Sequence, residues 1–352
     1  MKYHHAPVSG WINDPLALTW HDGRYHLFFQ HVPDSTTWRA DCRWGHATST
    51  DLLTWDTAPI ALEPDDDEAG CWSGSVAVGD DEVVLFYTAV DESGLDRGRV
   101  RRAVPLDEGW LSWAKQDVVV TAPPEATHFR DPFVQRHGDG WRMVVGASSG
   151  ADVGTAWAWT SNDLANWTYA GVLASRSAAE VDGAWIGPAW ECPQLVEVDG
   201  QEVLVVSVWE PGTLHHVAYR LGDAWKRLTY GPSHYAGSVF AHADRSPGLV
   251  TWLREVGGPG WTGATSLPMS LRLDDGHLVA CPPAGAPVTE WRPGVVVPGL
   301  TLEPGEGLVT VTGSRAPFDL PWDRGPLQVV VDAGVVEIYG RLGIAAVPAL
   351  TE

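Results

Sequence analysis

Short apolar runs separated by turn residues recur along this chain of 352 residues. Each run is rich in valine, leucine and aromatic residues, which is typical of β-strands. Five runs share a similar character, at residues 24–30, 82–89, 140–147, 201–208 and 248–254. They begin at intervals of 47 to 61 residues. Periods of this size, with several short strands in each repeat, indicate an all-β fold, a β-propeller with five blades.

Three carboxylates lie at the same distance from a turn signal. Asp14, Asp131 and Glu191 each precede an Asp-Gly pair by eight residues. A stretch of this length that ends in Asp-Gly and leads into an apolar run is typical of the first strand of a β-hairpin. Three acids at one point of equivalent strands are expected to face one another in the channel. Ser73 lies eight residues before Asp81 and takes their place in the second repeat. The alternative fold is a β-sandwich with chance Asp-Gly turns.

Composition narrows the class of partner. The formal net charge of −22 argues against nucleic acid and anionic membrane surfaces. The 20 tryptophans suit stacking on sugar rings, although propellers also use aromatic residues for packing. The four cysteines show no Cys-x-x-Cys spacing, and the N-terminus has no apolar segment long enough for a signal peptide or membrane span. We expect a cytoplasmic protein without cofactor or metal site, whose acidic run at residues 65–68 is a solvated loop.

The pattern changes after the proline-rich stretch at residues 282–287. Residues 1–282 are predicted to form the propeller, and residues 288–352 a small C-terminal β-sheet module. About 65 residues are few for an independent domain. A surface left uncovered here has to be polar or buried by a partner chain, and a homo-oligomer through this module would bury it.

The neighbours of the three acids suggest different roles. Cleavage of a sugar acetal needs one carboxylate that attacks or activates water and one carboxylic acid that protonates the leaving oxygen. Glu191 has largely apolar neighbours, which raise a carboxyl pKa toward that of a general acid. Asp131 follows Arg130, whose charge is expected to keep it ionised for charge stabilisation. Asp14, beside Asn13, is expected to be the nucleophile. For any one acid, the alternative is a turn cap or an ion pair.

The motifs around these acids resemble those of a known family. Residues 11–15 (WINDP), 129–132 (FRDP) and 190–193 (WECP) are similar to the three signatures of glycoside hydrolase family 32, the β-fructosidase family of invertases, levanases and inulinases. Further matches follow in family order, at residues 28–30 (FFQ), 44–47 (WGHA), 72–75 (WSGS) and 261–264 (WTGA). The resemblance covers about residues 3 to 282.

The resemblance implies a five-bladed propeller, retention of configuration and a fructosyl-enzyme intermediate. It makes Asp14 the nucleophile, Asp131 the transition-state stabiliser and Glu191 the acid/base. The implied substrate is a small carbohydrate, sucrose or a short fructo-oligosaccharide. The implied fructose subsite consists of Asn13, Gln30, Trp38, Trp72, Ser73, Arg130 and Trp252.

Two departures from the family bear on the substrate. The first motif continues with Leu16-Ala17, where the family usually has Asn-Gly. Trp38 is followed by Arg39-Ala40, where Gly and Asn or Pro are more usual. Arg39 could contact a leaving-group sugar or a carboxylate or phosphate on it, or it could be a solvated loop residue.

Three functions remain open from the sequence. The first is a retaining hydrolase that releases fructose from β-fructofuranosides. The second is a fructosyltransferase on the same scaffold, and the third is a catalytically silent sugar-binding propeller. The related α-L-arabinofuranosidases and β-xylosidases also use two Asp and one Glu, but the WINDP and WECP contexts disfavour them.

Overall fold

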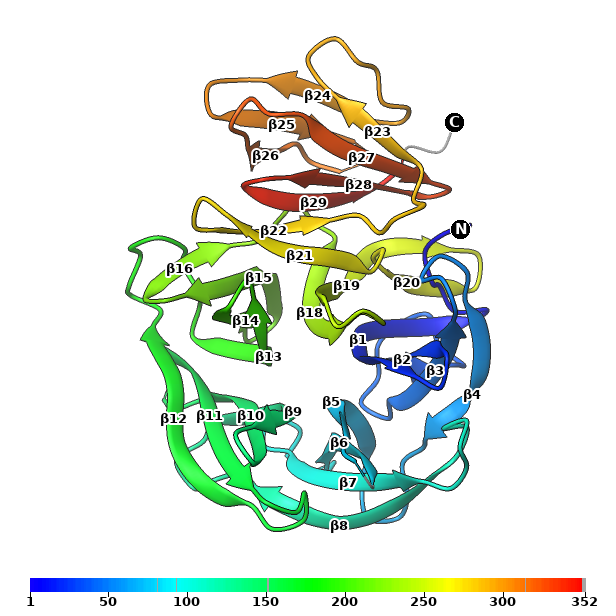
Figure 1. Cartoon of the computed structure of the whole chain (residues 1–352), viewed down its shortest axis with the longest axis vertical. Coiled ribbons are helices and arrows are strands. Elements are labelled where there is room, and N and C mark those ends of the chain that lie inside the picture. Colours follow the sequence, from blue (N-terminus) through cyan, green and yellow to red (C-terminus); the bar gives the residue numbers. More distant parts are fainter. Residues whose placement is uncertain (81, 93, 151, 314, 350–352) are drawn as a thin grey trace.

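The computed structural model describes residues 1–80, 82–92, 94–150, 152–313 and 315–349. Asp81, which marks the turn of the second repeat, lies outside the described residues. Every regular element in the described part of the chain is a β-strand. Five groups of four antiparallel strands stand around a central channel (Figure 1); three of them are separate sheets, and the first and the last are joined in one nine-stranded sheet. The predicted five-bladed propeller is therefore confirmed.

The blades follow one another along the chain. Blade one consists of β1 (Gly10–His21), β2 (Arg24–Val32), β3 (Arg43–Ser49) and β4 (Asp56–Leu62). Blade two consists of β5 (Gly70–Val78), β6 (Val83–Val90), β7 (Arg99–Pro105) and β8 (Trp113–Thr121). Blade three consists of β9 (His128–His137), β10 (Gly140–Ser148), β11 (Val153–Ser161) and β12 (Thr168–Ser177). Blade four consists of β13 (Ala189–Val198), β14 (Gln201–Glu210), β15 (Thr213–Leu221) and β16 (Ala224–Arg227). Blade five consists of β18 (His234–Ala241), β19 (Pro247–Gly258), β21 (Met269–Asp274) and β22 (His277–Cys281).

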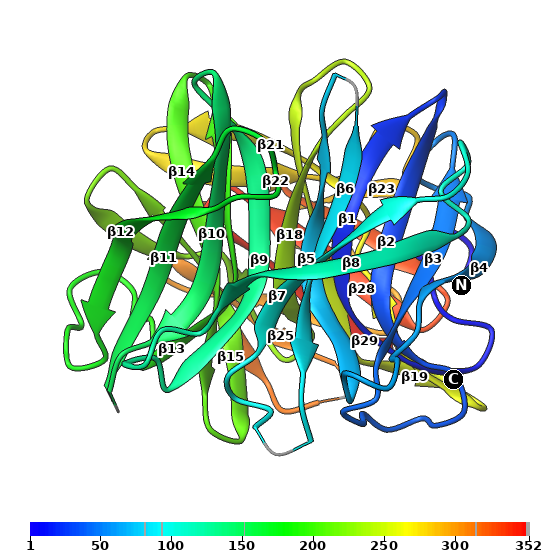
Figure 2. The same cartoon turned by 90° about the horizontal axis from the view of Figure 1, so that it is seen from below.

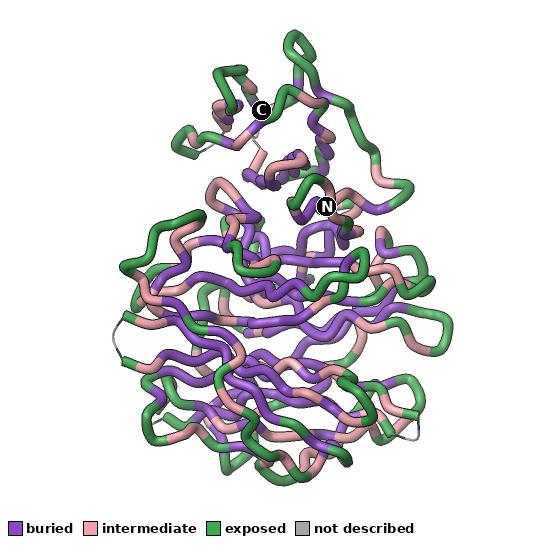
Figure 3. Tube along the Cα trace, turned by 60° about the vertical axis from the view of Figure 1, so that its left-hand side comes forward, coloured by how far each residue is buried: buried purple, intermediate pink, exposed green. Residues whose placement is uncertain are grey.

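The first strand of each blade lies nearest the channel, as Figure 1 shows for β1, β5, β9, β13 and β18. Seen from below, the strands of blades two and three run side by side through the thickness of the ring (Figure 2). The five apolar runs of the sequence lie in the second strands, and their residues are almost all buried. The inner part of the ring is mostly buried, and the exposed segments lie mainly at its periphery (Figure 3). Both faces of these strands pack against neighbouring blades, so they are continuously apolar instead of alternating.

The ring closes through a strand between its last and first blades. β20 (Trp261–Thr265) pairs antiparallel with β19 and parallel with β1, where Gly10 lies opposite Trp261. This pairing removes a free sheet edge between blades five and one.

The C-terminal tail forms two small sheets with a shared core, so the prediction of a short β-sandwich-like module is confirmed. One sheet contains β24 (Thr301–Pro304), β25 (Leu308–Thr312) and β26 (Phe318–Pro321). The other contains β23 (Val288–Trp291), β27 (Leu327–Asp332), β28 (Val335–Gly340), β29 (Gly343–Pro348) and the two-residue β17 (Thr229–Tyr230). Trp291 and Trp322 pack together in the core between the sheets.

The module is joined firmly to the propeller. β17 comes from the propeller part of the chain and pairs in parallel with β29. The Nδ1 of His4 lies 2.9 Å from Asp332 Oδ2, and its Nε2 lies 2.8 Å from Glu337 Oε2. Burial opposes protonation, but the Glu337 charge and both hydrogen bonds raise the pKa of His4 to about 9. The division at residues 1–282 and 288–352 stays a prediction, because the two parts share a sheet and this ion pair.

The acidic run at residues 65–68 is not wholly a solvated loop, which corrects the sequence expectation. Glu68 is buried, and its carboxylate contacts Lys115, Arg101 and the hydroxyl of Tyr87. The positive charges that pair with Glu68 come from β7 and β8, which follow it in the chain, so the run itself gave no sign of them.

Candidate active site

The inner strand of every blade contains a β-bulge near its N-terminal end. Pairing with the second strand is interrupted once in each of β1, β5, β9, β13 and β18 at this level. In the order of these five strands, the first residues left unpaired are Asp14, Ser73, Asp131, Cys192 and Ala236. All of them except Ser73 have positive φ, from 40° to 65°. Bulges at five equivalent points, four of them with strained backbone, are typical of a functional site.

The bulges create two rings of side chains around the channel. The bulge ring consists of the five residues just named. The pre-bulge ring consists of the last paired residue before each bulge: Asn13, Trp72, Arg130, Glu191 and Tyr235. Seven of the ten residues predicted to act in the site occupy these two rings.

The two rings correct one premise of the sequence argument. Asp14 and Asp131 belong to the bulge ring, whereas Glu191 belongs to the pre-bulge ring. Equal spacing to an Asp-Gly pair hides this difference, because the turn does not always begin at that pair. In blade three the turn begins at Gly138, one residue before the pair, whereas in blade four it begins at Asp199, the first residue of the pair. In β1, a second bulge around Ala17 adds a residue between Asp14 and the turn.

Four consecutive members of the pre-bulge ring, from Trp72 to Tyr235, contact one another. The Arg130 guanidinium lies 5.1 Å from the centre of the Trp72 ring, and its Nη1 lies 3.4 Å from Glu191 Oε1. The Tyr235 hydroxyl donates a 2.6 Å hydrogen bond to Glu191 Oε2. Both oxygens of Glu191 are therefore oriented, one by a cation and one by a phenol.

Arg130 is itself held by groups on its own blade and the next. Its Nη2 lies 2.6 Å from His128 Nδ1, and Trp209 stacks on His128 with ring centres 5.0 Å apart. Burial and the Arg130 charge lower the pKa of His128 well below its usual value. The neutral imidazole can therefore accept a hydrogen bond from the guanidinium and fix its direction.

The bulge ring orients Asp14. The Ser73 hydroxyl donates a 2.6 Å hydrogen bond to Asp14 Oδ2, and the Gln30 amide donates one of 3.2 Å to the same oxygen. Gln30 also contacts Ser73. Asn13 accepts a 2.9 Å hydrogen bond from the indole of Trp11, which fixes the residue next to Asp14.

Cys192 lies between the two aspartates. Its backbone N–H donates a 2.9 Å hydrogen bond to Asp131 Oδ2. Its sulfur lies 3.7 Å from that oxygen and 4.0 Å from Asp14 Oδ2. The backbone N–H of Asp131 in turn donates to the Thr88 hydroxyl at 2.8 Å. The bulges thus free backbone donors to hold the acids in place.

Burial sets the electrostatics of the three acids. It raises the pKa of Asp14, against the hydrogen bonds from Ser73 and Asn13. Burial and the charge of Glu191 raise the pKa of Asp131 to about 8. Burial also raises the pKa of Glu191, against the nearby charge of Arg130. Two carboxyl groups that share one buried site do not both ionise readily, so the Asp131–Glu191 pair retains a proton at neutral pH.

This arrangement corrects the expectation that Arg130 keeps Asp131 ionised. The ion pair of Arg130 within the site is with Glu191. Arg130 and Asp131 belong to different rings although they are neighbours in the chain. The bulge that begins at Asp131 breaks the regular alternation and separates the two side chains into different rings, so adjacency in the chain did not predict which acid Arg130 pairs with.

The remaining predicted residues lie around the two rings. Trp38 is 45% exposed and meets Trp72 edge-on, with ring centres 5.6 Å apart. Trp252 is buried in a cluster with Cys192 and Tyr235. Gln30 is buried behind Asp14. Trp38 is therefore exposed beside the pre-bulge ring, whereas Trp252 and Gln30 are buried against members of the two rings.

Sequence reasoning missed three residues of the site: Tyr235, Cys192 and His128. A signal for Tyr235 was present, because the run at residues 234–241 precedes the fifth apolar run as the other inner strands precede theirs. Cys192 was noted only as an apolar neighbour of Glu191, and its place between the aspartates depends on the bulge. His128 carried no signal beyond its position two residues before Arg130.

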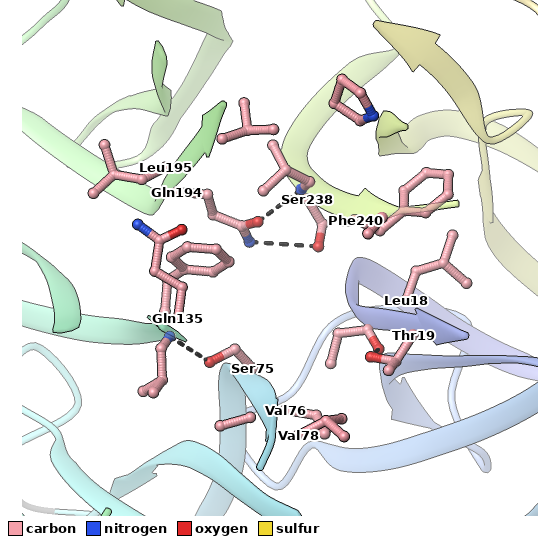
Figure 4. Close-up of a pocket in the computed structure, with 18 of the residues that line it drawn as sticks. Leu18, Thr19, Ser75, Val76, Val78, Gln135, Gln194, Leu195, Ser238 and Phe240 are labelled. Atoms are coloured by element: carbon pink, nitrogen blue, oxygen red, sulfur yellow. Dashed lines mark hydrogen bonds between the residues drawn. The ribbon is translucent and has the colours of Figure 1, made fainter. Parts of the chain in front are cut away.

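The opposite end of the channel contains a cavity of about 770 Å³. Its lining includes residues from the C-terminal halves of the five inner strands (Figure 4). Glu197 is the one carboxylate among the described residues that line it. Polar side chains there form hydrogen bonds with backbone groups of neighbouring strands. The Gln194 amide oxygen accepts a 2.7 Å hydrogen bond from the Val239 N–H, and Ser75 Oγ accepts one of 2.9 Å from the Val134 N–H. The three clustered acids do not line this cavity, and its size alone does not make it the reactive site.

No three His, Cys, Asp or Glu side chains in the described ranges are arranged to hold a metal ion. No helix with the length and apolar character of a membrane span occurs in these ranges either.

The chain is similar in sequence and in structure to known proteins. Residues 4–282 match the family described as "Glycosyl hydrolases family 32 N-terminal domain". Sucrose-6-phosphate hydrolase of Escherichia coli is 33% identical over 315 residues, and raffinose invertase of the same species is 32% identical over 315. Each alignment covers 80% of this chain and 64% of the relative. The chain thus spans slightly less than two thirds of the length of these relatives.

Solved structures show the same fold. A mutant of the GH32 β-fructofuranosidase of Bombyx mori, in complex with sucrose, has a TM-score of 0.84 and 25% identity, and the match covers all of this chain and 89% of that one. The sucrose-6-phosphate hydrolase of Lactobacillus gasseri has a TM-score of 0.81 and 23% identity, with 100% and 88% covered. With the family match extending over most of its length, the chain belongs to glycosyl hydrolase family 32.

Proposed function

We propose that this protein is a retaining hydrolase that releases fructose from β-fructofuranosides such as sucrose or short fructo-oligosaccharides. The observation that carries the proposal is the convergence of Asp14, Asp131 and Glu191 at one end of the channel, with donors fixing each acid. The names of the relatives, sucrose-6-phosphate hydrolase and raffinose invertase, support a sucrose-type substrate.

In the first step, Asp14 attacks the anomeric carbon of the fructosyl unit and forms an ester bond to it. The bond from that carbon to the leaving oxygen breaks, and Glu191 gives its proton to that oxygen. Ser73 and Gln30 hold Asp14 Oδ2, which leaves the carboxylate in a fixed direction. Preorganisation of this kind lowers the entropic cost of reaching the transition state.

In the second step, Glu191 removes a proton from water as the water oxygen attacks the same carbon, and the ester bond to Asp14 breaks. Asp131 accepts hydrogen bonds from sugar hydroxyls. When the proton of the Asp131–Glu191 pair is on Glu191, Asp131 carries a negative charge that stabilises the oxocarbenium-like transition state. Asn13, Trp72, Arg130 and Trp252 complete the proposed fructose subsite.

The test is turnover by the full chain of sucrose, raffinose, 1-kestose and inulin, with quantified products. We expect equimolar glucose and fructose from sucrose. In the presence of methanol, retention predicts methyl β-fructofuranoside as the transfer product, whereas an α-product would contradict the double displacement. Fructose transfer to sucrose in place of release would favour the transferase alternative. Binding without turnover would favour the silent propeller.

A cytoplasmic location and self-association through the C-terminal module belong to the same proposal. The module displays exposed valines, of which Val296 is the most exposed, at 85%. Light scattering across a concentration series measures the association, and fractionation of producing cells measures the location. A monomer at all concentrations would overturn the first, and enrichment outside the cytoplasm the second.

A further inference from the structure

The loops next to the two rings carry an excess of negative charge. Antiparallel pairing brings the end of each second strand beside the start of its inner strand, so the loops after β2 and β6 lie at the same end of the channel as the three acids. The loop at residues 33–42 contains two aspartates and one arginine, and the loop at residues 91–98 contains three acids and one arginine. A leaving group that departs at this end of the channel meets these loops.

Arg39 follows Trp38 in the chain, and two carboxylates already engage it. Its Nε and Nη2 donate to the two oxygens of Asp41 at 2.9 and 2.7 Å, and Nη2 also donates to Asp34 Oδ1 at 2.9 Å. The hydrogen bond from Arg39 holds the pKa of Asp41 below its usual range, so this acid stays ionised. The group of three side chains has a net charge of −1.

The segment around Arg39 is fixed at the rim of the site. The carbonyl oxygen of Ala40 accepts a 2.8 Å hydrogen bond from the Trp72 indole, and Trp38 packs edge-on against the same ring. Trp72 also contacts Arg130, which contacts Glu191. The loop is therefore connected by direct contacts to the acid that would protonate the leaving group.

The other guanidinium groups on this side are engaged as well. Arg130 lies 3.4 Å from Glu191 Oε1 and 3.8 Å from Asp96 Oδ1. Arg99 lies 2.7 Å from Asp91 Oδ1. Of the arginines in these loops, Arg39 faces carboxylates and Arg97 donates to the carbonyl oxygen of Pro123 at 2.9 Å, while Arg99 and Arg130 in the neighbouring strands each face a carboxylate.

We propose that the leaving-group subsite selects an uncharged sugar and disfavours a phosphorylated one, and that Asp34 and Asp41 set this preference by neutralising Arg39. The inference rests on the proposed function and runs against the sucrose-6-phosphate named in several relatives. Exposed Trp38 offers a neutral sugar ring a flat apolar face. A phosphate monoester carries about −1.5 to −2 charges at neutral pH. At about 8 Å from one excess negative charge, such a group loses roughly fivefold in binding even in bulk water.

The experiment compares kcat/KM for sucrose and sucrose-6-phosphate with the full chain at low salt. We expect sucrose to be preferred by about tenfold or more, with the preference shrinking as added salt screens the charges. The double variant Asp34→Asn/Asp41→Asn changes the net charge of the group from −1 to +1. It is expected to raise kcat/KM for sucrose-6-phosphate about tenfold while that for sucrose changes less than threefold.

Two further variants separate a local from a general charge effect. The control double variant Asp80→Asn/Glu197→Gln removes the same number of negative charges at the other end of the channel. It is expected to leave kcat/KM for sucrose and for sucrose-6-phosphate within twofold of the wild-type values. Arg39→Ala leaves both aspartates unpaired, and it is expected to reduce kcat/KM for sucrose-6-phosphate severalfold further.

A wild-type preference for sucrose-6-phosphate would overturn this inference alone, as would an equal gain in the remote double variant. Absence of turnover on every fructoside by the folded protein would overturn the proposed function, and this inference with it.

Discussion

At one end of the central channel the five inner strands bulge, and at the other end four of them pair regularly. The bulged end presents three carboxyl groups and strained residues such as Asp131. The other end has the cavity of about 770 Å³, in which Gln194 and Ser75 satisfy neighbouring backbone groups. The same strands thus provide reactive groups where their ladder is broken and structural contacts where it is intact. A bulge turns two successive side chains toward the channel and frees backbone donors, which regular pairing cannot do.

The largest expected effect is at Asp14, the proposed nucleophile. Asp14→Asn keeps the shape of the side chain but removes the attacking charge, and it is expected to lower kcat about 10⁴-fold or more. The matched control is Asp22→Asn, at the turn that ends the same strand, where turnover is expected to stay within twofold. Stopped assays with sucrose measure both. A kcat near the wild-type value in Asp14→Asn would contradict the assignment of the reactive groups to the bulged end of the channel.

The next effect compares two glutamates of β13. Glu191→Gln removes the proposed proton donor and is expected to lower kcat about 10²- to 10⁴-fold on sucrose. The loss is expected to be much smaller on a fructoside whose leaving group is a nitrophenol, since that group departs without protonation. Glu197→Gln changes the same side chain at the cavity end and is expected to be silent. Equal losses in the two variants would contradict the assignment.

A third prediction concerns the pH profile of kcat/KM. Because burial raises the pKa of Asp14, the acid limb is expected above the usual range of an aspartate. The alkaline limb is expected near pH 8, where the Asp131–Glu191 pair loses its proton. The Tyr235 hydrogen bond lowers the pKa of Glu191, so Tyr235→Phe is expected to move the alkaline limb to higher pH. A downward shift would contradict the hydrogen bond as described.

The smallest effect concerns the one inner strand that is also bulged toward the cavity end. Ala17 has a φ of 46° in the second bulge of β1, where the family usually has glycine. Relief of this strain by Ala17→Gly is expected to increase the free energy of unfolding by about 1 kcal/mol, with kcat unchanged. Denaturant titration measures the change. Destabilisation would indicate that burial of the Ala17 methyl group outweighs the strain.

Much of the fold could be predicted from local patterns. The five apolar runs are the second strands of five blades, and the residues before them are the inner strands. The identities of Asp14, Asp131 and Glu191 also followed from their spacing and motifs. The interpretation of Leu16-Ala17 did not go far enough, because the departure from the family motif was visible in the residues but the extra bulge that accommodates it was not.

What the sequence could not predict depends on register. The three acids were expected in one ring, yet Glu191 precedes its bulge while Asp14 and Asp131 lie within theirs. A shift of one residue in a strand changes the face to which a side chain points. The position of each bulge depends on pairing with the next strand and on the hairpin turn, so counting residues to an Asp-Gly pair could not reveal it.

The sequence by itself determined the repeat, the blades and the three acids, because these depend on strand-length patterns and on residue type. Only the tertiary structure decided which acid meets Arg130, that Tyr235 and Cys192 join the site, and that Arg39 is already paired. The reason is physical: these contacts join residues that are far apart in the chain or that face unexpected directions. Closure of the ring brings them together, and the bulges set their directions.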